Sequence, residues 1–188
     1  MMTEEINSAL IRISPFIVLI SVIYLFLRLK RFSRNDIYLQ PPVSLFRYAV
    51  WCLSFLIFII FIEIIMYKTA YLQVDTWQHS WLPSVIRITG AVLLAPVAEE
   101  LFFRGLLLYR LEKMKLNIHL AIALQAVLFV IAHNFAYENT LQSNIAVAQT
   151  FSDATLYAYA RQHTKSLLTP ITMHMTGNII ATLERFVV

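Results

Sequence analysis

The chain has 188 residues, of which 59% are hydrophobic and only 14% charged, and its mean hydropathy is +0.67. A soluble domain is about a quarter charged, so this composition indicates an integral membrane protein. Three widely spaced glycines exclude a phosphate-binding loop and a GxSxG nucleophile elbow, and the single Cys52 excludes a disulfide framework, a CxxC redox centre and a thiolate zinc site.

Six apolar stretches predict an all-α, polytopic bundle of about six transmembrane helices that forms a single membrane domain, residues 1–188. In chain order they run from about Ala9 to Leu29, Tyr48 to Met66, Ser84 to Leu111, Ile118 to Tyr137, Ile145 to Ala160 and Leu167 to Leu183. The last two are the least apolar, because polar residues interrupt them. The first two, within residues 1–83, carry no motif, so the motif-bearing core is about 84–183.

The basic residues predict the orientation. Most lie in or beside the first, third and fifth connections, namely Arg28, Lys30, Arg31, Arg34, Arg47, Arg110, Lys113, Lys115, Arg161 and Lys165. The two intervening loops, Tyr67 to Pro83 and Asn134 to Asn144, contain Lys68 as their only Lys or Arg. The positive-inside rule therefore places the odd connections in the cytoplasm and both termini outside, as expected in a prokaryotic inner membrane. The net charge of +4 then reflects topology, and we expect no nucleic-acid partner.

Ionisable groups inside apolar helices are costly and usually face a bundle interior or a wet cavity. The third predicted helix carries EELFFR, in which Glu100 and Arg104 are i,i+4 neighbours that can form an ion pair. Glu99 lies on a neighbouring helix face, about 100° away, and stays free to titrate. Pro96 lies just upstream, where it can kink the helix or free a backbone carbonyl.

Two further helices carry matching polar groups. The fourth has Phe129 and His133 one turn apart, and the sixth has His174 and Asn178 one turn apart. A carboxylate beside an imidazole can activate water as a general base, and an imidazole with a carboxamide can stabilise an oxyanion. Alternatively, Glu99, His133 and His174 could bind zinc, although the helical HExxH signature is absent.

Each element alone also has a purely structural interpretation. The two glutamates and the arginine could form an ion-pair clasp, and an intramembrane histidine is more often a hydrogen-bonding group than a catalyst. Their joint occurrence favours a shared active site among the third, fourth and sixth helices. We interpret Glu63 and Arg87 as a structural pair near the outer face, Asp153 as lining the site or solvating a helix break, and the remaining histidines as surface groups: His79, His119 and His163.

The ordered motifs EExxxR, FxxxH and HxxxN resemble those of the CPBP intramembrane proteases, which comprise CAAX prenyl endopeptidases and bacteriocin-processing or self-immunity proteins, also called the ABI family. The resemblance covers about Ser84 to Leu183. It departs from the family pattern at Ala154, where members often have glycine, which leaves close helix packing there open.

The resemblance implies a glutamate-dependent intramembrane endopeptidase acting on a peptide or protein at the membrane. Glu99 and His133 would polarise the attacking water, His174 and Asn178 would stabilise the oxyanion, and Glu100 with Arg104 would support the site architecture. No cofactor is certain and zinc stays open, as do the oligomeric state and the substrate. Two alternatives from other classes are a non-catalytic partner-binding or immunity protein and a small transporter, although no inverted repeat is visible.

The predicted depths of these groups disagree. Glu99 and His174 would lie about 8 and 10 Å from the cytoplasmic ends of their helices, whereas His133 would lie nearer the opposite face. Convergence then requires a strong tilt, a break around His133, or a fourth helix that begins outside the bilayer.

Overall fold

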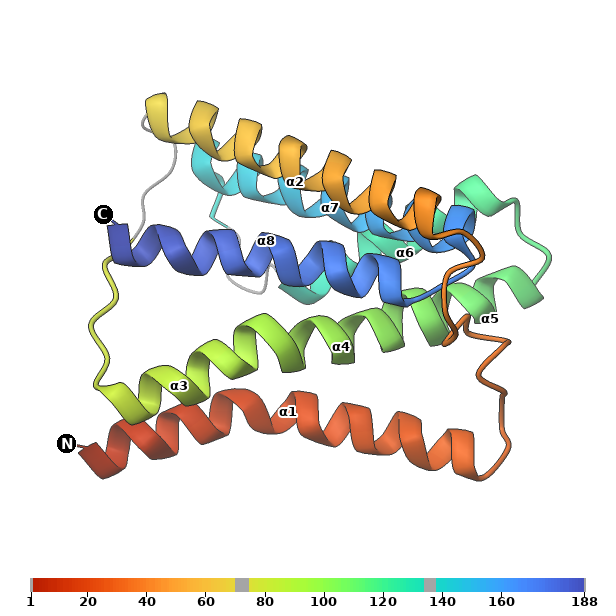
Figure 1. Cartoon of the computed structure of the whole chain (residues 1–188), viewed down its shortest axis with the longest axis horizontal. Helices are drawn as coiled ribbons and strands as arrows, with labels where there is room; N and C mark the ends of the chain where they lie inside the picture. Colours follow the sequence, from red (N-terminus) through yellow and green to blue (C-terminus); the bar gives the residue numbers. More distant parts are fainter. Residues whose placement is uncertain (1, 70–74, 134–137, 188) are drawn as a thin grey trace.

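The computed structural model describes residues 2–69, 75–133 and 138–187, and these residues form helices without any strand (Figure 1). Helices that each form a separate rod are α1 (Met2–Arg28), α2 (Leu45–Lys68), α6 (Ile118–His133), α7 (Leu141–Thr164) and α8 (Leu168–Val187). One longer rod joins α3 (Trp81–Thr89), η1 (Gly90–Leu94), α4 (Ala95–Glu99), η2 (Glu100–Leu107) and α5 (Leu108–Lys113). The all-α prediction is confirmed, and each predicted stretch coincides with one rod. Residues 134–137 of the fourth stretch lie outside the described residues.

Two of these helices, α1 and α2, are by length and composition able to cross a membrane. At 16 residues, α6 is apolar but shorter than a full crossing, which takes about 20 residues. The 24 residues of α7 are long enough but contain many polar side chains. Polar residues that face a bundle interior lower the mean hydropathy without contacting lipid, so the number of crossings stays a prediction.

The rod from α3 to α5 lies between α1 on one side and α8 on the other (Figure 1). Beyond α8 lie α2 and α7, and α6 packs along α7. Side chains of α1, the rod and α8 form one apolar cluster around Ile23, Leu101 and Ile171. A second cluster joins α2, α7 and α8 through Phe55, Tyr157 and Met173. The polar residues of the motifs lie between these two clusters.

The connection into α8 begins well inside the bundle. The Leu167 N–H donates to the Tyr38 carbonyl at 2.8 Å. A Cβ added to Gly105 would lie 3.3 Å from Leu167 Cδ1, so this glycine lets α8 start close against η2. Since α8 begins level with Gly105 and not with Lys113, a side chain two turns into α8 can reach Glu99.

The loop between α1 and α2 is folded back on itself. Both the backbone N–H and the hydroxyl of Ser33 donate to Asp36 Oδ2 at 2.8 Å. These hydrogen bonds stabilise the charged carboxylate and lower the pKa of Asp36 below its usual value, with the backbone N–H of Ser33 as the largest cause. The loop thereby holds Ile37 and Tyr38 under the start of α8.

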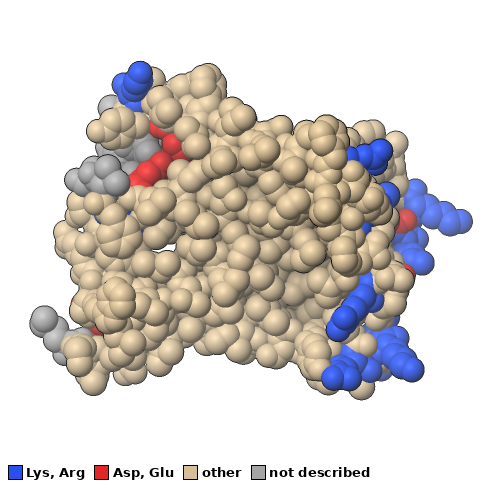
Figure 2. All heavy atoms as spheres, viewed as in Figure 1, with Lys and Arg blue, Asp and Glu red and all other residues tan. Residues whose placement is uncertain are grey.

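The charged residues are segregated. Figure 2 shows most lysines and arginines at the end of the bundle where α1 and α5 end and α2 begins. The two chain termini lie at the opposite end (Figure 1). Most of the basic residues that are dispersed along the sequence are therefore gathered at one end in space, which agrees with the positive-inside rule.

Replacing Gly90 with alanine is expected to destabilise the bundle. A Cβ at Gly90 would lie 2.3 Å from Ile13 Cγ2 of α1, a β-branched methyl that cannot easily move aside. Overpacking of this kind costs about 1–3 kcal/mol, so we expect a lower thermal denaturation midpoint in detergent. Gly177→Ala is the control, because the nearest neighbour of its added Cβ lies at 3.6 Å. Ile13→Ala combined with Gly90→Ala should recover part of the loss. Equal midpoints for both glycine variants would contradict this packing.

Candidate active site

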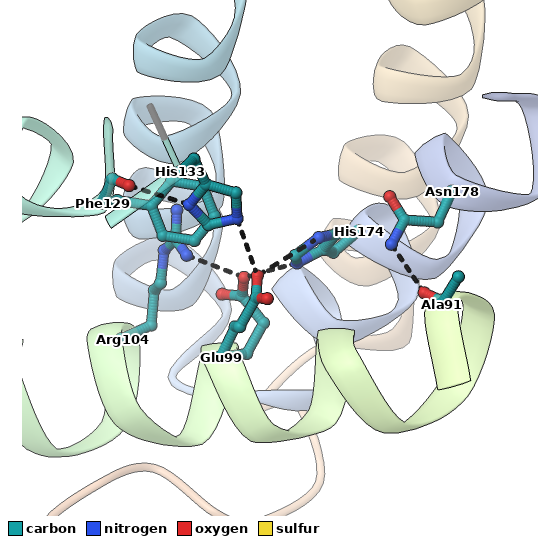
Figure 3. Close-up of polar contacts among 8 residues, drawn as sticks. Ala91, Glu99, Arg104, Phe129, His133, His174 and Asn178 are labelled. Carbon is teal, nitrogen blue, oxygen red and sulfur yellow. Dashed lines mark hydrogen bonds and ion pairs between the residues drawn. The ribbon is translucent and has the colours of Figure 1, made fainter. Parts of the chain in front are cut away.

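The side chains of the three motifs meet at one carboxylate. Glu99 Oε2 lies 3.3 Å from His133 Nε2 and 3.8 Å from His174 Nε2. Figure 3 shows the carboxylate of Glu99 between the two imidazoles, which come from α6 and α8. Within the described residues, this oxygen is buried and has no hydrogen bond of good geometry. The carboxylate of Glu99 and the imidazoles of His133 and His174 therefore face a common point, but no well-formed hydrogen bond connects them to Oε2 of Glu99.

A second, fully buried charge centre lies behind Glu99. Glu100 Oε1 accepts hydrogen bonds from Arg104 Nη1 at 2.8 Å and from His174 Nδ1 at 2.9 Å. Arg104 is completely buried, and its guanidinium lies 4.2 Å from the Phe129 ring centroid and 5.1 Å from that of Tyr157. Aromatic faces and a paired carboxylate are what a buried arginine needs in place of water. The predicted i,i+4 pair is present.

His133 is held by its own helix. Its Nδ1 lies 2.8 Å from the Phe129 carbonyl oxygen, and its ring stacks on the Phe129 ring at a centroid distance of 4.1 Å. The Nδ1–H donates to this carbonyl, since a carbonyl can only accept. Nε2 is thereby directed at Glu99. About a third of the His133 side chain, 36%, remains exposed, compared with 9% for His174.

Asn178 is connected to the long rod through a π-helical irregularity. The Ala95 N–H donates to the carbonyl of Gly90, five residues earlier, and Pro96 has no N–H. The carbonyl of Ala91 thus lacks both the α-helical and the π-helical donor, and it accepts a hydrogen bond from Asn178 Nδ2 at 2.7 Å. Pro96 does free a backbone carbonyl, as predicted, and the carboxamide of Asn178 binds it (Figure 3).

A cavity of about 300 Å³ contains the meeting point. Glu99, His133, His174 and Asn178 line it, whereas Glu100 and Arg104 are fully buried and do not. Of the six predicted site residues, four therefore face the cavity and two lie behind it. This matches the supporting position expected for Glu100 and Arg104.

Helix α7 adds groups that the sequence analysis missed or left ambiguous. Gln149, Asp153 and Tyr157 line the cavity at intervals of four residues. The Tyr157 ring stacks on His174 at 5.2 Å, and Asp153 lies in an unbroken helix. Asp153 therefore lines the site and does not mark a helix break. The i,i+4 spacing of polar side chains in α7 was the available signal for Gln149 and Asp153.

Two expectations are wrong. Glu63 accepts a hydrogen bond from Gln149 and lines the cavity, whereas Arg87 donates to Ser8, so these two do not form the predicted pair. The depth of Glu99 was also misjudged. About 20 Å of helix separates Glu99 from Lys113, and about 22 Å separates Ile118 from His133, so both groups lie at a similar depth. Neither a break nor a strong tilt is needed.

Other expectations hold. His79, His119 and His163 are exposed. Ala154 is completely buried in a cluster with Phe103, Ala126 and Phe129. The methyl group of Ala154 packs inside this cluster, so the helices fit together beside the candidate site with alanine in place of the glycine that is frequent in the family.

The zinc alternative has suitable donor types but no assembled centre. Each imidazole donates its Nδ1–H to an acceptor and directs Nε2 at Glu99, as a histidine does when its Nε2 binds a metal. In the part of the chain that the structure describes, however, no group of three or more His, Cys, Asp or Glu side chains is placed to hold a metal ion. We therefore derive no chemical step through a metal.

Removing Arg104 is expected to destabilise the protein strongly. Arg104→Ala leaves Glu100 buried without its charge partner, which costs about 3–5 kcal/mol of unfolding free energy. Arg110→Ala on the same rod is the control, because Arg110 is exposed and exposed substitutions usually change stability by less than about 0.5 kcal/mol. Chemical denaturation in mixed micelles measures both. Equal stability of the two variants would contradict a buried ion pair.

Comparison with known protein families identifies the fold and the motifs together. A model for type II CAAX prenyl endopeptidase Rce1-like proteins matches residues 45–180, which include every motif of the site. Comparisons with curated proteins and with solved structures found no match. The match covers more than two thirds of the chain and agrees with the family resemblance of its motifs. The chain belongs to the type II CAAX prenyl endopeptidase Rce1-like family of membrane-integral proteases.

Proposed function

We propose that the protein is an intramembrane endopeptidase that hydrolyses a peptide bond in a membrane-associated peptide or protein, using water activated by Glu99 and His133. The proposal is supported above all by the Nε2 atoms of His133 and His174, which lie 3.3 and 3.8 Å from the same oxygen of Glu99 at the wall of a cavity. Among the described residues, Thr150 alone brings a Ser, Thr or Cys side chain to this cavity, and it forms no hydrogen bond with Glu99, His133 or His174, so water is the expected nucleophile.

Proton transfer follows from the hydrogen bonds of His133. Because its Nδ1–H donates to the Phe129 carbonyl, Nε2 of the neutral ring carries a lone pair. Nε2 of His133 and Oε2 of Glu99 can therefore share a proton. Glu99 accepts a proton from the attacking water while the water oxygen bonds to the substrate carbonyl carbon. The same proton is later delivered to the leaving amine.

Stabilisation of the oxyanion falls to His174 and Asn178. The Nδ1–H of His174 donates to Glu100, whose charge is fixed by Arg104. When both ring nitrogens of His174 carry a proton, Nε2 also donates a hydrogen bond, toward the cavity. Asn178 uses one of its two amide hydrogens on Ala91 and retains the other for the oxyanion. Glu100 and Arg104 are positioning residues in this scheme.

A non-catalytic binding or immunity protein of the same fold is the alternative. That function would need neither a cavity lined by Glu99, His133 and His174 nor a buried carboxylate that orients His174. All of these features are present together, which favours catalysis.

We further propose that the bundle crosses a prokaryotic inner membrane six times with its basic end in the cytoplasm. The cavity is lined by Glu63 near the end of α2, Gln149 near the start of α7 and Ala181 late in α8. These positions lie toward the end that holds the chain termini, opposite the basic end. The substrate would then be an extracytoplasmic segment, such as a leader or sorting segment of an exported protein, in preference to a prenylated cytoplasmic tail.

Glu99→Gln is expected to lower peptide cleavage by about 10²–10⁴-fold without unfolding the protein, since it removes the general base and keeps the side-chain shape. The assay uses purified protein in liposomes and a panel of membrane-tethered peptides, prenylated and unprenylated. Glu63→Gln is the matched control, because Glu63 lines the same cavity but its hydrogen-bond partner is Gln149 and not a histidine. It should retain most of the activity.

Cleavage that persists in Glu99→Gln would refute the role of Glu99, and no cleavage by the wild type would favour the binding-protein alternative. Metal analysis of the same preparations tests zinc. Stoichiometric metal that is lost in His133→Ala would favour the metal-dependent version over metal-free hydrolysis.

Cysteine labelling tests the orientation. In a Cys52→Ser background, single cysteines at positions 110–115 should react with a membrane-impermeant maleimide only after the cells are opened. Cysteines at positions 78–80 should react in intact cells. The reverse pattern would invert the bundle and place the cavity mouth in the cytoplasm.

A further inference from the structure

A second cavity, of about 480 Å³, lies between α1, α3 and α8, and its arginines play no part in the proposed hydrolysis. Three arginines from three helices line it: Arg12, Arg87 and Arg185. His79 and Trp77 add to its rim. No carboxylate lines it among the described residues, so its lining carries a net charge of about three positive units at neutral pH.

Among the described residues, none of the three arginines lies within ion-pair distance of a carboxylate. Arg87 Nη2 donates to the hydroxyl of Ser8 at 3.0 Å, and its Nε is buried without a hydrogen bond in the described part of the chain. The carboxylate of Glu5 interacts electrostatically with Arg87. Glu5 accepts a hydrogen bond from Ser80 at 2.6 Å, however, and does not line the cavity. Arg12 and Arg185 are exposed, whereas Arg87 is half-buried, so Arg87 is the arginine of the three whose charge most needs a bound anion.

The position of Arg12 indicates what kind of anion this is. Arg12 lies three residues, or about 4.5 Å, inside the apolar stretch that begins at Ala9, beside Leu10 and Ile11, which are 46% and 71% exposed. In a bilayer these neighbours contact lipid chains, so the cavity opens at the level where lipid headgroups meet acyl chains. Arginine binds phosphate through paired hydrogen bonds and is more weakly hydrated than lysine, which suits such a site.

The rim of the cavity is held in place by specific contacts. The Trp77 N–H donates to the Arg185 carbonyl at 2.9 Å, and the indole Nε1–H donates to Ser84 at 2.7 Å. The indole also stacks on Phe186 at 5.3 Å. The approach to α3 is therefore tied to the end of α8, and an interfacial tryptophan stands at the opening.

The two cavities share one wall. Asn178 lines both, and its hydrogen bond to Ala91 separates the arginine cavity from the catalytic one. A peptide substrate bound at Glu99 would have to break this contact to reach the arginines, whereas a lipid reaches them from the bilayer side. A lipid is therefore the occupant that the geometry favours.

We propose that the cavity lined by Arg12, Arg87 and Arg185 binds the phosphate of an anionic phospholipid headgroup in the extracytoplasmic leaflet. The bound lipid neutralises the arginines and stabilises the packing of α1, α3 and α8. Through the shared wall it also supports the carboxamide of Asn178. This site is separate from the peptidase activity and does not depend on it.

The test uses the full-length protein, purified in detergent and depleted of lipid. Phosphatidylglycerol and phosphatidylcholine with the same acyl chains are titrated in, and the thermal midpoint gives the apparent affinity. We expect phosphatidylglycerol to bind at least about tenfold more tightly than phosphatidylcholine. Arg12→Gln and Arg87→Gln should each weaken phosphatidylglycerol binding by about tenfold, as for the loss of a charge-assisted hydrogen bond. Arg12→Lys, which keeps the charge, should retain most of the preference even if the glutamine variant folds poorly.

Arg34→Gln is the matched control, because Arg34 is exposed at the opposite end of the bundle. Equal binding of the two lipids, or an equal loss in Arg34→Gln, would overturn the site. Inorganic phosphate that raises the midpoint as effectively as the lipid would overturn the lipid as the source of the phosphate. Displacement of phosphatidylglycerol by a short peptide with a free carboxyl terminus, but not by its amide, would assign the cavity to a peptide instead.

Discussion

The structure depends on neutralising one buried arginine. Arg104 has no access to water, so its charge is balanced by Glu100 on the same helix and by the faces of Phe129 and Tyr157 on α6 and α7. The Glu100 carboxylate, which forms the ion pair with Arg104, also accepts the hydrogen bond from His174 of α8. Four helical segments therefore meet around a single charge, and the cavity residues are positioned as a consequence.

Much of this arrangement follows from residue spacing. The i,i+4 pair of Glu100 and Arg104 is local, and local helical geometry needs no knowledge of the fold. That Glu99, His133 and His174 would meet could be argued from the cost of isolated polar groups in apolar helices. The spacing could also indicate that Pro96 frees a carbonyl, because that effect depends only on the missing N–H.

What the sequence could not predict depends on where helices begin and how they rotate. The reach of His174 to Glu99 required knowing that α8 begins level with Gly105, which depends on the folded loop that holds Tyr38 beneath the start of α8. The partner of Asn178 required the π-helical turn at Gly90. Tyr157 was missed because an aromatic residue in a membrane helix usually contacts lipid, and only tertiary packing turns it toward His174.

The long rod carries its reactive carboxylate between two wide turns. Glu99 ends a five-residue α-helical piece, with π-helical geometry on both sides at Gly90–Leu94 and Glu100–Leu107. A π turn holds one residue more than an α-helical turn, so it rotates every later side chain about the helix axis relative to an uninterrupted α-helix. Insertion of single residues during evolution would produce such a rod. An insertion within Gly90–Leu94 would redirect Glu99 while the preceding segment, Trp81–Thr89, kept its packing against α1.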